Sequence, residues 1–350
     1  MERVSSKILI IRTSAIGDVV MASPLAAALR NTYPEAHIAW LVEPGIHELL
    51  LGDPCLDELI LWPKREWRQL LKARRFVELV RRIRAFRAML RARQFDMVLD
   101  LQGLLKSGLL AWLTGAPRRV GLGSKEGSQW LMTERYLRGG DHQRISSEYL
   151  FLAQKLGLQC DGFLPRMVVA ADAEDRALKL LADLQLQPGT YAVFAPFTTR
   201  PQKHWFEESW RDLAALLVEQ TGLTPLLLGG PDDRAAAAQI VGEDRRCVSL
   251  VGSTHLPEAA ALIKHAALLV GVDTGLTHMG IALNRPTVAI FGSTCPYLAT
   301  CRTNAQVLWL GKACSPCRRN PTCDGAYPCL REILPELVLE TALKVLENAS

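Results

Sequence analysis

Short apolar runs alternate with longer amphipathic stretches along the first part of the chain. Residues 7–34 begin with an apolar run, continue through a loop of small residues and end in an amphipathic stretch. Short apolar runs predict buried strands, and amphipathic stretches between them predict helices that cover a parallel sheet. The first half is therefore expected to be an α/β unit, with further strands over residues 37–42, 56–62 and 95–103.

The same alternation begins again near residue 191, after a polar and irregular stretch over residues 157–190 that we interpret as a linker containing one helix. Two similar doubly wound halves are thus predicted, followed by a final helix within residues 332–349. In open parallel sheets, ligands bind beyond the carboxyl ends of the strands, so we expect a site in the cleft between the halves. The strands expected in the second half are 191–196, 224–230, 247–252, 267–275 and 287–293, and helices are expected over 207–222, 232–242 and 257–266.

Composition is consistent with a soluble protein of two domains. The chain has 350 residues, of which 49% are apolar and 22% are charged, and a typical domain has roughly 100 to 200 residues. No apolar run approaches the ~20 residues that span a bilayer. The first apolar run is too short for a signal peptide, so we expect a cytoplasmic protein.

The net charge of +5 comes from a single segment. Residues 64–93 contain twelve Lys or Arg and two Glu, a net charge of +10, so the other 320 residues carry −5. Two interpretations remain open: a solvated helix face, or a contact with anionic lipid or a phosphorylated acceptor, to which each basic residue would contribute ~1 kcal/mol. The apolar residues of this segment fall on one helical stripe, which consists of Phe76, Leu79, Val80, Ile83, Phe86 and Leu90.

The loop after the first expected strand, residues 12–20, carries a carboxylate near the start of a helix. Ser14, Ala15 and Gly17 permit a close turn, and Asp18 lies at or near the helix N-terminus. Asp18 is either a helix cap worth ~1 to 2 kcal/mol or a base that takes a proton from an incoming hydroxyl. The loop matches neither G-x-G-x-x-G nor G-x-x-x-x-G-K-[ST], which disfavours a dinucleotide-dependent oxidoreductase and a P-loop protein.

In the second half, the first expected strand ends in a loop with hydroxyl groups and cations. Thr198 and Thr199 supply the hydroxyls, Arg200 and Lys203 supply positive charge, and a helix begins shortly afterwards. Such groups favour phosphate oxygens, so this loop is either an anion receptor or an ordinary surface loop.

Two further strand ends of the second half carry polar residues. Asp232 follows two glycines and either accepts ribose hydroxyls or caps the next helix. The stretch "VDTGLTH" places Thr274 and Gly275 where helix-start N–H groups would point at an anion, with Asp273 and His278 beside them. Several such loops in one cleft favour a phosphate-bearing ligand.

Four of the nine cysteines lie together near the end of the chain. In a cytosolic protein such a cluster favours a metal site or reduced thiols over disulfides. Four thiolates suit tetrahedral zinc, although this spacing is tighter than that of common zinc modules. The candidate ligands are Cys314, Cys317, Cys323 and Cys329.

Taken together, these motifs resemble those of the bacterial ADP-heptose:lipopolysaccharide heptosyltransferases, glycosyltransferase family 9, over nearly the whole chain. The resemblance is carried by "TSAIGDVV", "DLQGLLKSGLL", "TTRPQKHWFEESW" and "VDTGLTHMGIALNRPTVAIFGSTCP". Within the family, "TTR" followed by "KHW" and the "DTGLTH" loop are closer to heptosyltransferase I. The cysteine cluster is no part of the enterobacterial type I pattern.

The resemblance implies a GT-B fold, with two Rossmann-like domains that face a central cleft. It implies an acceptor-binding domain over residues 1–170 and a nucleotide-sugar-binding domain over 171–350, which contains the Cys-rich segment 314–329 and the final helix. The implied reaction is an inverting transfer of L-glycero-D-manno-heptose from ADP-heptose to the Kdo region of lipid A. Two alternatives remain: a family member that adds a second heptose or another sugar, and a non-catalytic nucleotide-binding protein.

The resemblance also implies roles for individual residues. Asp18 matches the general base, and Lys203 matches a lysine that contacts the donor phosphates. Asp232 is a looser match to a ribose ligand, and Gln102 and Lys106 are candidates on the acceptor side. The remaining implied donor-binding residues are Thr198, Thr199, Asp273, Thr274, Gly275 and His278.

The expected partners are ADP-heptose, a Kdo-lipid A acceptor and an anionic membrane surface, and nucleic acid is not among them. The chain contains no D-x-D pair, so we expect catalysis without a metal cofactor; a structural metal at the cysteine cluster is a separate hypothesis. The expected location is the cytoplasm, peripherally at the inner face of the bacterial inner membrane.

Overall fold

The computed structural model describes residues 7–242 and 246–349 and divides the chain into two compact units. The first unit comprises residues up to 142 and 146–165, and the second comprises residues 143–145 and those from 166 onward. Each unit has its own hydrophobic core, as expected for domains of this size. Within the described ranges, no helix is both long enough and apolar enough to cross a membrane.

The first unit is built on a six-stranded parallel sheet with the strand order β3-β2-β1-β4-β5-β6. This order is that of a doubly wound Rossmann-like sheet. The chain starts with a central strand, adds strands toward one edge, and then returns to the centre and adds strands toward the other edge. The reversal lies between β1 and β4, so the loops that follow these two strands lie at the switch point. The strands are β1 Lys7–Ile11, β2 His37–Val42, β3 Glu58–Leu61, β4 Met97–Asp100, β5 Arg118–Leu122 and β6 Glu134–Tyr136.

Helices cover both faces of this sheet. Successive residues of a strand point to opposite faces, and because the strand residues on both faces are apolar, each face is buried under helices. Ile8 and Ile10 of β1 join one core cluster, whereas Leu9 and Ile11 join the cluster on the opposite face. The first cluster includes residues of α2 and α6, and the second includes residues of α4 and α5. The helices of the unit are α1 Ile16–Ala22, α2 Pro24–Thr32, α3 Lys64–Lys72, α4 Phe76–Ala92, α5 Leu105–Thr114 and α6 Ser147–Lys155.

The structure differs from the predicted elements of this unit at three points. The first amphipathic stretch forms two helices, because Pro24 has no N–H to continue α1 and begins α2 instead. The basic segment also forms two helices, separated by a turn in which Arg74 has a φ of 55°. The strands β5 and β6 were not predicted, because "RRVGL" and "ERY" are short and contain charged residues.

The second unit repeats the same architecture, with the strand order β12-β11-β10-β7-β8-β9. The predicted doubly wound α/β fold is thus confirmed in both halves, although the short strand β12 was not predicted. The strands are β7 Tyr191–Ala195, β8 Thr224–Leu227, β9 Val248–Ser249, β10 Leu268–Val272, β11 Thr287–Ile290 and β12 Ala305–Leu308. The helices are α7 Ala171–Asp183, α8 Glu207–Thr221, α9 Arg234–Val241, α10 Leu256–His265, α11 Gly275–Ala282, α12 Pro328–Arg331 and α13 Pro335–Glu347.

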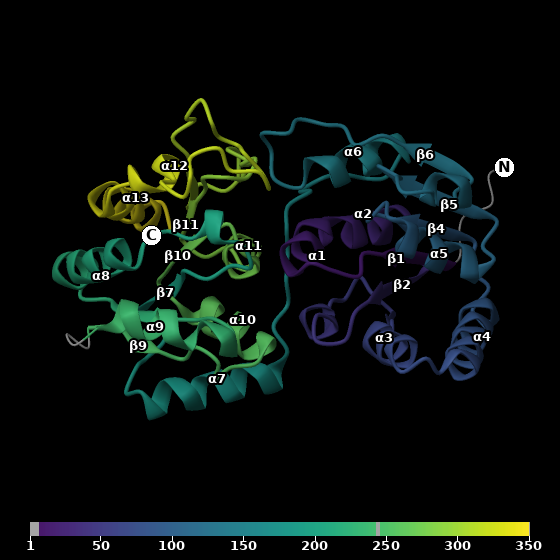
Figure 1. Ribbon diagram of the computed structural model, residues 1–350, viewed down its shortest axis with the longest axis horizontal. Helices are drawn as coiled ribbons and strands as arrows, with labels where there is room; N and C mark the ends of the chain where they lie inside the picture. The colour runs from purple at the N-terminus through teal and green to yellow at the C-terminus, as the bar shows by residue number, and fades with distance from the viewer. Residues whose placement is uncertain (1–6, 243–245, 350) are drawn as a thin grey trace. The chain divides into compact units, whose positions relative to one another are not determined.

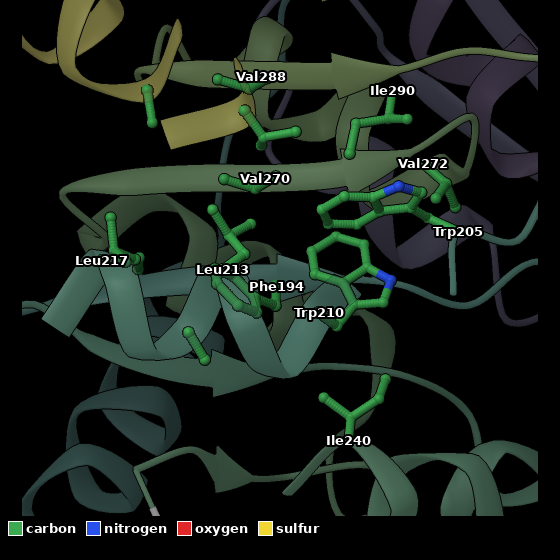
Figure 2. Packing of buried hydrophobic residues seen from close by; sticks show 14 of the residues in the cluster. Phe194, Trp205, Trp210, Leu213, Leu217, Ile240, Val270, Val272, Val288 and Ile290 are labelled. Atoms are coloured by element: carbon green, nitrogen blue, oxygen red, sulfur yellow. The ribbon is translucent and has the colours of Figure 1, made fainter. Parts of the chain in front are cut away.

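Aromatic side chains of α8 and its N-terminal approach fill one face of the second sheet. Figure 2 shows Trp210 between Phe194 of β7 and Trp205. The ring centroid of Trp210 lies 5.1 Å from that of Phe194 and 5.0 Å from that of Trp205. Leu213 and Leu217 continue the buried stripe along the same helix, at the spacing of successive helical turns. This packing fixes the start of α8, and with it the loop that precedes the helix.

The final helix belongs to the second unit. Val338, Ala342 and Val345 of α13 are buried in the same core cluster as Trp210. These positions recur at helical spacing, so α13 buries one face beside α8, as Figure 1 shows at the C-terminal end of the chain.

Candidate active site

The predicted base lies at the carboxyl end of β1 in the first unit. Helix α1 begins after Ala15, so Asp18 is its third residue rather than its cap, and its Oδ2 accepts a hydrogen bond from the Ala15 N–H at 3.3 Å. The same oxygen pairs with the guanidinium of Arg12. Within the described part of the chain, Oδ1 of Asp18 has no partner, and the side chain is 38% exposed. One carboxylate oxygen is thus held by the protein and the other is free to accept a proton.

Arg12, which the sequence analysis did not single out, holds Asp18 from a buried position. Its Nη1 donates to the carbonyl of Leu101 at 3.1 Å, and its own carbonyl accepts a hydrogen bond from Trp40 Nε1 at 3.1 Å. These hydrogen bonds connect the Arg12 guanidinium to the loop after β4 and the Arg12 backbone to β2. A buried, tethered guanidinium gives Asp18 a defined orientation, because a charged hydrogen bond is both short and directional.

The two acceptor-side candidates lie in and after the loop that follows β4. Gln102 is buried, and its Oε1 accepts hydrogen bonds from Thr13 Oγ1 at 2.8 Å and from the Thr13 N–H at 3.3 Å. This side chain therefore joins the loops after β1 and β4. Lys106 is half-buried on α5, and partial burial together with the charge of Lys64 lowers the pKa of its ammonium. Lys64, which pairs with Glu43 at 2.7 Å, was recognised in the sequence only as part of the basic segment.

In the second unit, Asp273 is a hub that joins three loops. It follows β10 directly, and its Oδ2 lies 2.6 Å from Lys203 Nζ. The same ammonium donates to the Asp273 carbonyl at 3.0 Å, and Thr294 Oγ1 donates to Oδ2 at 2.7 Å. The structure therefore brings Lys203 and Asp273 together and adds Thr294. That residue was overlooked because a threonine in a loop gives no distinctive signal.

The other oxygen of Asp273 contacts His278, one turn into α11. Nε2 of His278 lies 3.3 Å from Asp273 Oδ1, and its Nδ1 lies 2.7 Å from the hydroxyl of Tyr297. Burial would raise the pKa of the Asp273 carboxyl, yet the hydrogen bond from His278 and the charge of Lys203 hold that pKa well below its usual range. Burial raises the pKa of Tyr297, which stays neutral. Asp273 and His278 thus shape the loop.

The start of α11 leaves backbone donors beside this hub. Thr274 is the N-cap residue and Gly275 is the first residue of the helix. The first N–H groups of a helix have no partner within it and carry partial positive charge, which suits an anionic ligand. Thr277 anchors this turn, because its hydroxyl donates to the Val272 carbonyl at 2.6 Å.

The remaining donor-side candidates lie in the loops after β7 and β8. The carbonyl of Thr198 lies 2.8 Å from Nε2 of His204, and Thr199 is exposed. Asp232 does not cap α9, because Asp233 directly precedes the helix and its Oδ2 accepts the Gly230 N–H at 2.8 Å. Asp232 is exposed, and within the described ranges its side chain has no hydrogen bond or ion pair. Its carboxylate is therefore available to a ligand.

The Cys-rich segment packs against two of these loops. The Arg318 N–H donates to the Ser293 carbonyl at 2.6 Å, next to Thr294, and Gln202 Nε2 donates to the Arg318 carbonyl at 3.1 Å, next to Lys203. Burial, reinforced by the neighbouring thiols, raises the pKa of Cys329 to about 11. Among the described residues, no group of three or more His, Cys, Asp or Glu side chains is arranged so that it could hold a metal ion. The metal hypothesis stays a prediction.

Comparisons with known proteins agree on one family. A sequence profile described as glycosyltransferase family 9 (heptosyltransferase) matches residues 83–327. Lipopolysaccharide heptosyltransferase 1 of Pseudomonas aeruginosa is 31% identical over 91% of this chain and 87% of its own length. Lipopolysaccharide heptosyltransferase 2 of Escherichia coli is 27% identical over 98% of this chain and 100% of its own. The solved structure of E. coli heptosyltransferase WaaC with ADP has a TM-score of 0.74 and 25% identity, with 97% of this chain and 99% of that chain covered.

Proposed function

Because the chain belongs to glycosyltransferase family 9, the heptosyltransferase family, we propose that it adds L-glycero-D-manno-heptose from ADP-heptose to Kdo on lipid A. It is a heptosyltransferase of lipopolysaccharide core biosynthesis with a GT-B fold, as its relatives and structural neighbours are. The finer assignment, addition of the first heptose, is supported by the greater identity to type 1 enzymes than to type 2 enzymes. The alternative is addition of a second heptose, supported by coverage of a type 2 enzyme over its whole length.

The observation that carries the donor side is the hub at Asp273. Departure of ADP places negative charge on a phosphate oxygen, and groups already aimed there stabilise the transition state most. Lys203 is held by Asp273 at 2.6 Å and by a backbone carbonyl at 3.0 Å, so its ammonium needs little reorganisation on donor binding. The N–H groups at Gly275 add partial positive charge from α11. We assign the diphosphate to these groups, the ribose to Asp232, and supporting hydroxyls to Thr198 and Thr199.

On the acceptor side, Asp18 is assigned as the base of an inverting single displacement. The acceptor hydroxyl oxygen forms a bond to the anomeric carbon, the bond from that carbon to the ADP phosphate oxygen breaks on the opposite face, and the proton passes to Asp18 Oδ1. Arg12 holds this carboxylate in place, and the proton moves late, as the new bond forms. Gln102 and Lys106 are assigned to the acceptor, and Lys106 supplies a cation for its carboxylates.

The protein is further proposed to work at the cytoplasmic face of the inner membrane, peripherally bound, because its lipid A acceptor resides in a bilayer. No nucleic acid partner is proposed. Catalysis is proposed to need no metal cofactor, since the sequence lacks the D-x-D pair with which many glycosyltransferases hold one. A structural metal at Cys314, Cys317, Cys323 and Cys329 is proposed separately, and elemental analysis of anaerobically purified protein tests it. Absence of zinc and iron would contradict it.

A transfer assay with two acceptors tests the function. Purified protein is incubated with ADP-heptose and either Kdo2-lipid A or its heptosylated product in the presence of EDTA. The masses of the lipids are then measured by mass spectrometry. One added heptose on the first acceptor alone is the expected result. Addition only to the heptosylated lipid would assign the second transfer, and a requirement for added divalent metal would contradict metal independence. No transfer to either lipid, with or without added divalent metal and with ADP still bound, would indicate a non-catalytic nucleotide-binding protein.

A further inference from the structure

Helix α4 carries an apolar stripe that the protein covers along only part of its length. At the C-terminal half of the helix, Phe86 and Leu90 are buried in the core beneath the sheet. In its first two turns, Phe76, Val77 and Val80 are 55%, 87% and 46% exposed. The stripe predicted from the sequence is therefore real but continues beyond the surface that it packs against. Exposed apolar groups of this size, clustered in adjacent turns, indicate a surface that meets an apolar partner.

The preceding turn extends this apolar cluster. Residues 71–77, from the end of α3 to the start of α4, are exposed without interruption, and Leu71 adds another large apolar side chain. Helices α3 and α4 lie side by side in the first unit, so this turn forms the tip of a helical hairpin (Figure 1). We call residues 71–80 the hairpin tip.

Cations surround the hairpin tip and exceed the local carboxylates. The two acidic residues of the hairpin are already paired, Glu66 with Arg82 at 2.9 Å and Glu78 with Arg75. Within residues 7–242 and 246–349, the other exposed cations of α3, the tip and the first turns of α4 have no ion-pair partner. They are Arg65, Arg68, Lys72, Arg74, Arg81 and Arg84.

We propose that the hairpin tip docks onto an anionic lipid bilayer, with Leu71, Phe76 and Val77 inserted below the headgroups and the arginines paired with lipid phosphates. This combination is that of an interfacial amphipathic segment, in which apolar burial and attraction to anionic lipid act together. Long Arg and Lys side chains can keep their charge at headgroup level while their stems lie along apolar surface. The inference deepens the peripheral membrane association of the proposed function and rests on it for the identity of the lipid.

Charge favours a bilayer over a second copy of this chain as the occupant. Two copies that met through this surface would bring together net charges of the same sign, because residues 64–93 carry +10. The two copies would repel each other, and because salt screens this repulsion, their association would become stronger only at high salt. A membrane with anionic lipid instead neutralises the charge and accepts apolar side chains on the same face.

Co-sedimentation with vesicles tests the apolar contribution. Vesicles of phosphatidylethanolamine and phosphatidylglycerol are compared with vesicles of phosphatidylcholine, without donor or acceptor. Val77→Ser is expected to weaken binding to the anionic vesicles several-fold, and Phe76→Ser together with Val77→Ser roughly tenfold or more, since each loses apolar burial. The matched control is Leu137→Ser, whose side chain is 86% exposed elsewhere in the first unit and which should bind like the wild type. Equal binding by Val77→Ser and the wild type would overturn insertion.

The charge contribution is tested in the same assay. Arg81→Gln with Arg84→Gln should weaken binding roughly 25-fold, because each basic residue near an anionic surface raises affinity about fivefold. The matched control, Arg135→Gln with Lys179→Gln, removes two exposed charges elsewhere. Binding of the wild type should fall as salt rises. Failure of the wild type to bind anionic vesicles, or a shift to dimers at the same concentration, would overturn the bilayer as occupant.

Two measurements separate failure of docking from failure of the proposed function. Transfer to acceptor dispersed in neutral detergent should be unchanged in Phe76→Ser with Val77→Ser, whereas transfer to the same acceptor in anionic vesicles should fall in parallel with binding. Loss of both activities would place the hairpin tip in the transfer site instead and overturn the proposal. A wild type that binds vesicles but transfers no heptose would leave docking intact and contradict the function.

Discussion

Replacement of Asp273 by Asn is expected to destabilise the second unit and to weaken donor binding. The carboxylate lies 2.6 Å from Lys203 Nζ, 2.7 Å from Thr294 Oγ1 and 3.3 Å from His278 Nε2. Its side chain and that of Lys203 are largely buried, at 15% and 16% exposure. The substitution keeps the shape of the residue but leaves the ammonium without its counter-charge.

The magnitude follows from this burial. Removal of one partner from a buried ion pair costs about 3 to 5 kcal/mol, because the other charge stays buried without compensation. Asn retains one oxygen that can still accept a hydrogen bond from Lys203 or Thr294, so the lower end, about 3 kcal/mol, is expected for Asp273→Asn. A double-mutant cycle that combines Asp273→Asn with Lys203→Met should show an interaction energy of about 1.5 to 3 kcal/mol between the two residues.

The effect should depend on pH in a definite direction. The pKa of the Asp273 carboxyl is well below its usual range in the folded protein, whereas that of an unfolded Asp is about 3.9. The group therefore contributes stability that is fully present above the unfolded pKa and is lost as the pH falls toward the folded pKa. The difference in the free energy of unfolding between the wild type and Asp273→Asn should be constant near neutral pH and should decrease below about pH 4.

Urea unfolding, followed by circular dichroism and by tryptophan fluorescence, measures these differences. The matched control is Asp232→Asn, an exposed carboxylate in the same unit, which should change the free energy of unfolding by less than about 0.5 kcal/mol. The Michaelis constant for ADP-heptose should rise in Asp273→Asn, since Lys203 loses its orientation. If Asp273→Asn unfolds like the control and keeps donor affinity, the hub does not hold Lys203 and the reasoning fails.

Three further outcomes are expected. Asp18→Asn should lower kcat by about 10² to 10⁴ while leaving the affinity for ADP unchanged, measured by steady-state kinetics and calorimetry, and a kcat close to the wild-type value would remove it as the base. Cys329, whose pKa is raised to about 11 by burial, should alkylate far more slowly at pH 8 than exposed Cys295, as peptide mass spectrometry would show. Phe86→Ala should destabilise the first unit by about 3 to 5 kcal/mol and Phe76→Ala by less than about 0.5, since only the former is buried; similar losses in urea unfolding would contradict the assigned packing of α4.

The polar residues at strand ends could be predicted from sequence, but their partners could not. Apolar runs that stop at a loop indicate where a parallel strand ends, so Asp18 and Asp273 were located correctly relative to β1 and β10. Pairing between Lys203 and Asp273, however, spans 70 residues of chain. Local spacing carries no information about such a contact, and it also left open whether Asp232 caps the next helix, a position that Asp233 occupies in the structure.

By itself, the sequence determined the two doubly wound halves and the loops in which the chemistry resides, because strand and helix periods are local properties that survive any packing arrangement. Only the tertiary structure decided that Arg12 orients Asp18, that α13 packs on the second sheet, and that the stripe of α4 is buried at Leu90 but exposed at Val77. The physical reason is that a periodic pattern shows which face of a helix is apolar. What covers that face depends on segments that are distant in the chain, and these meet only when the cores form.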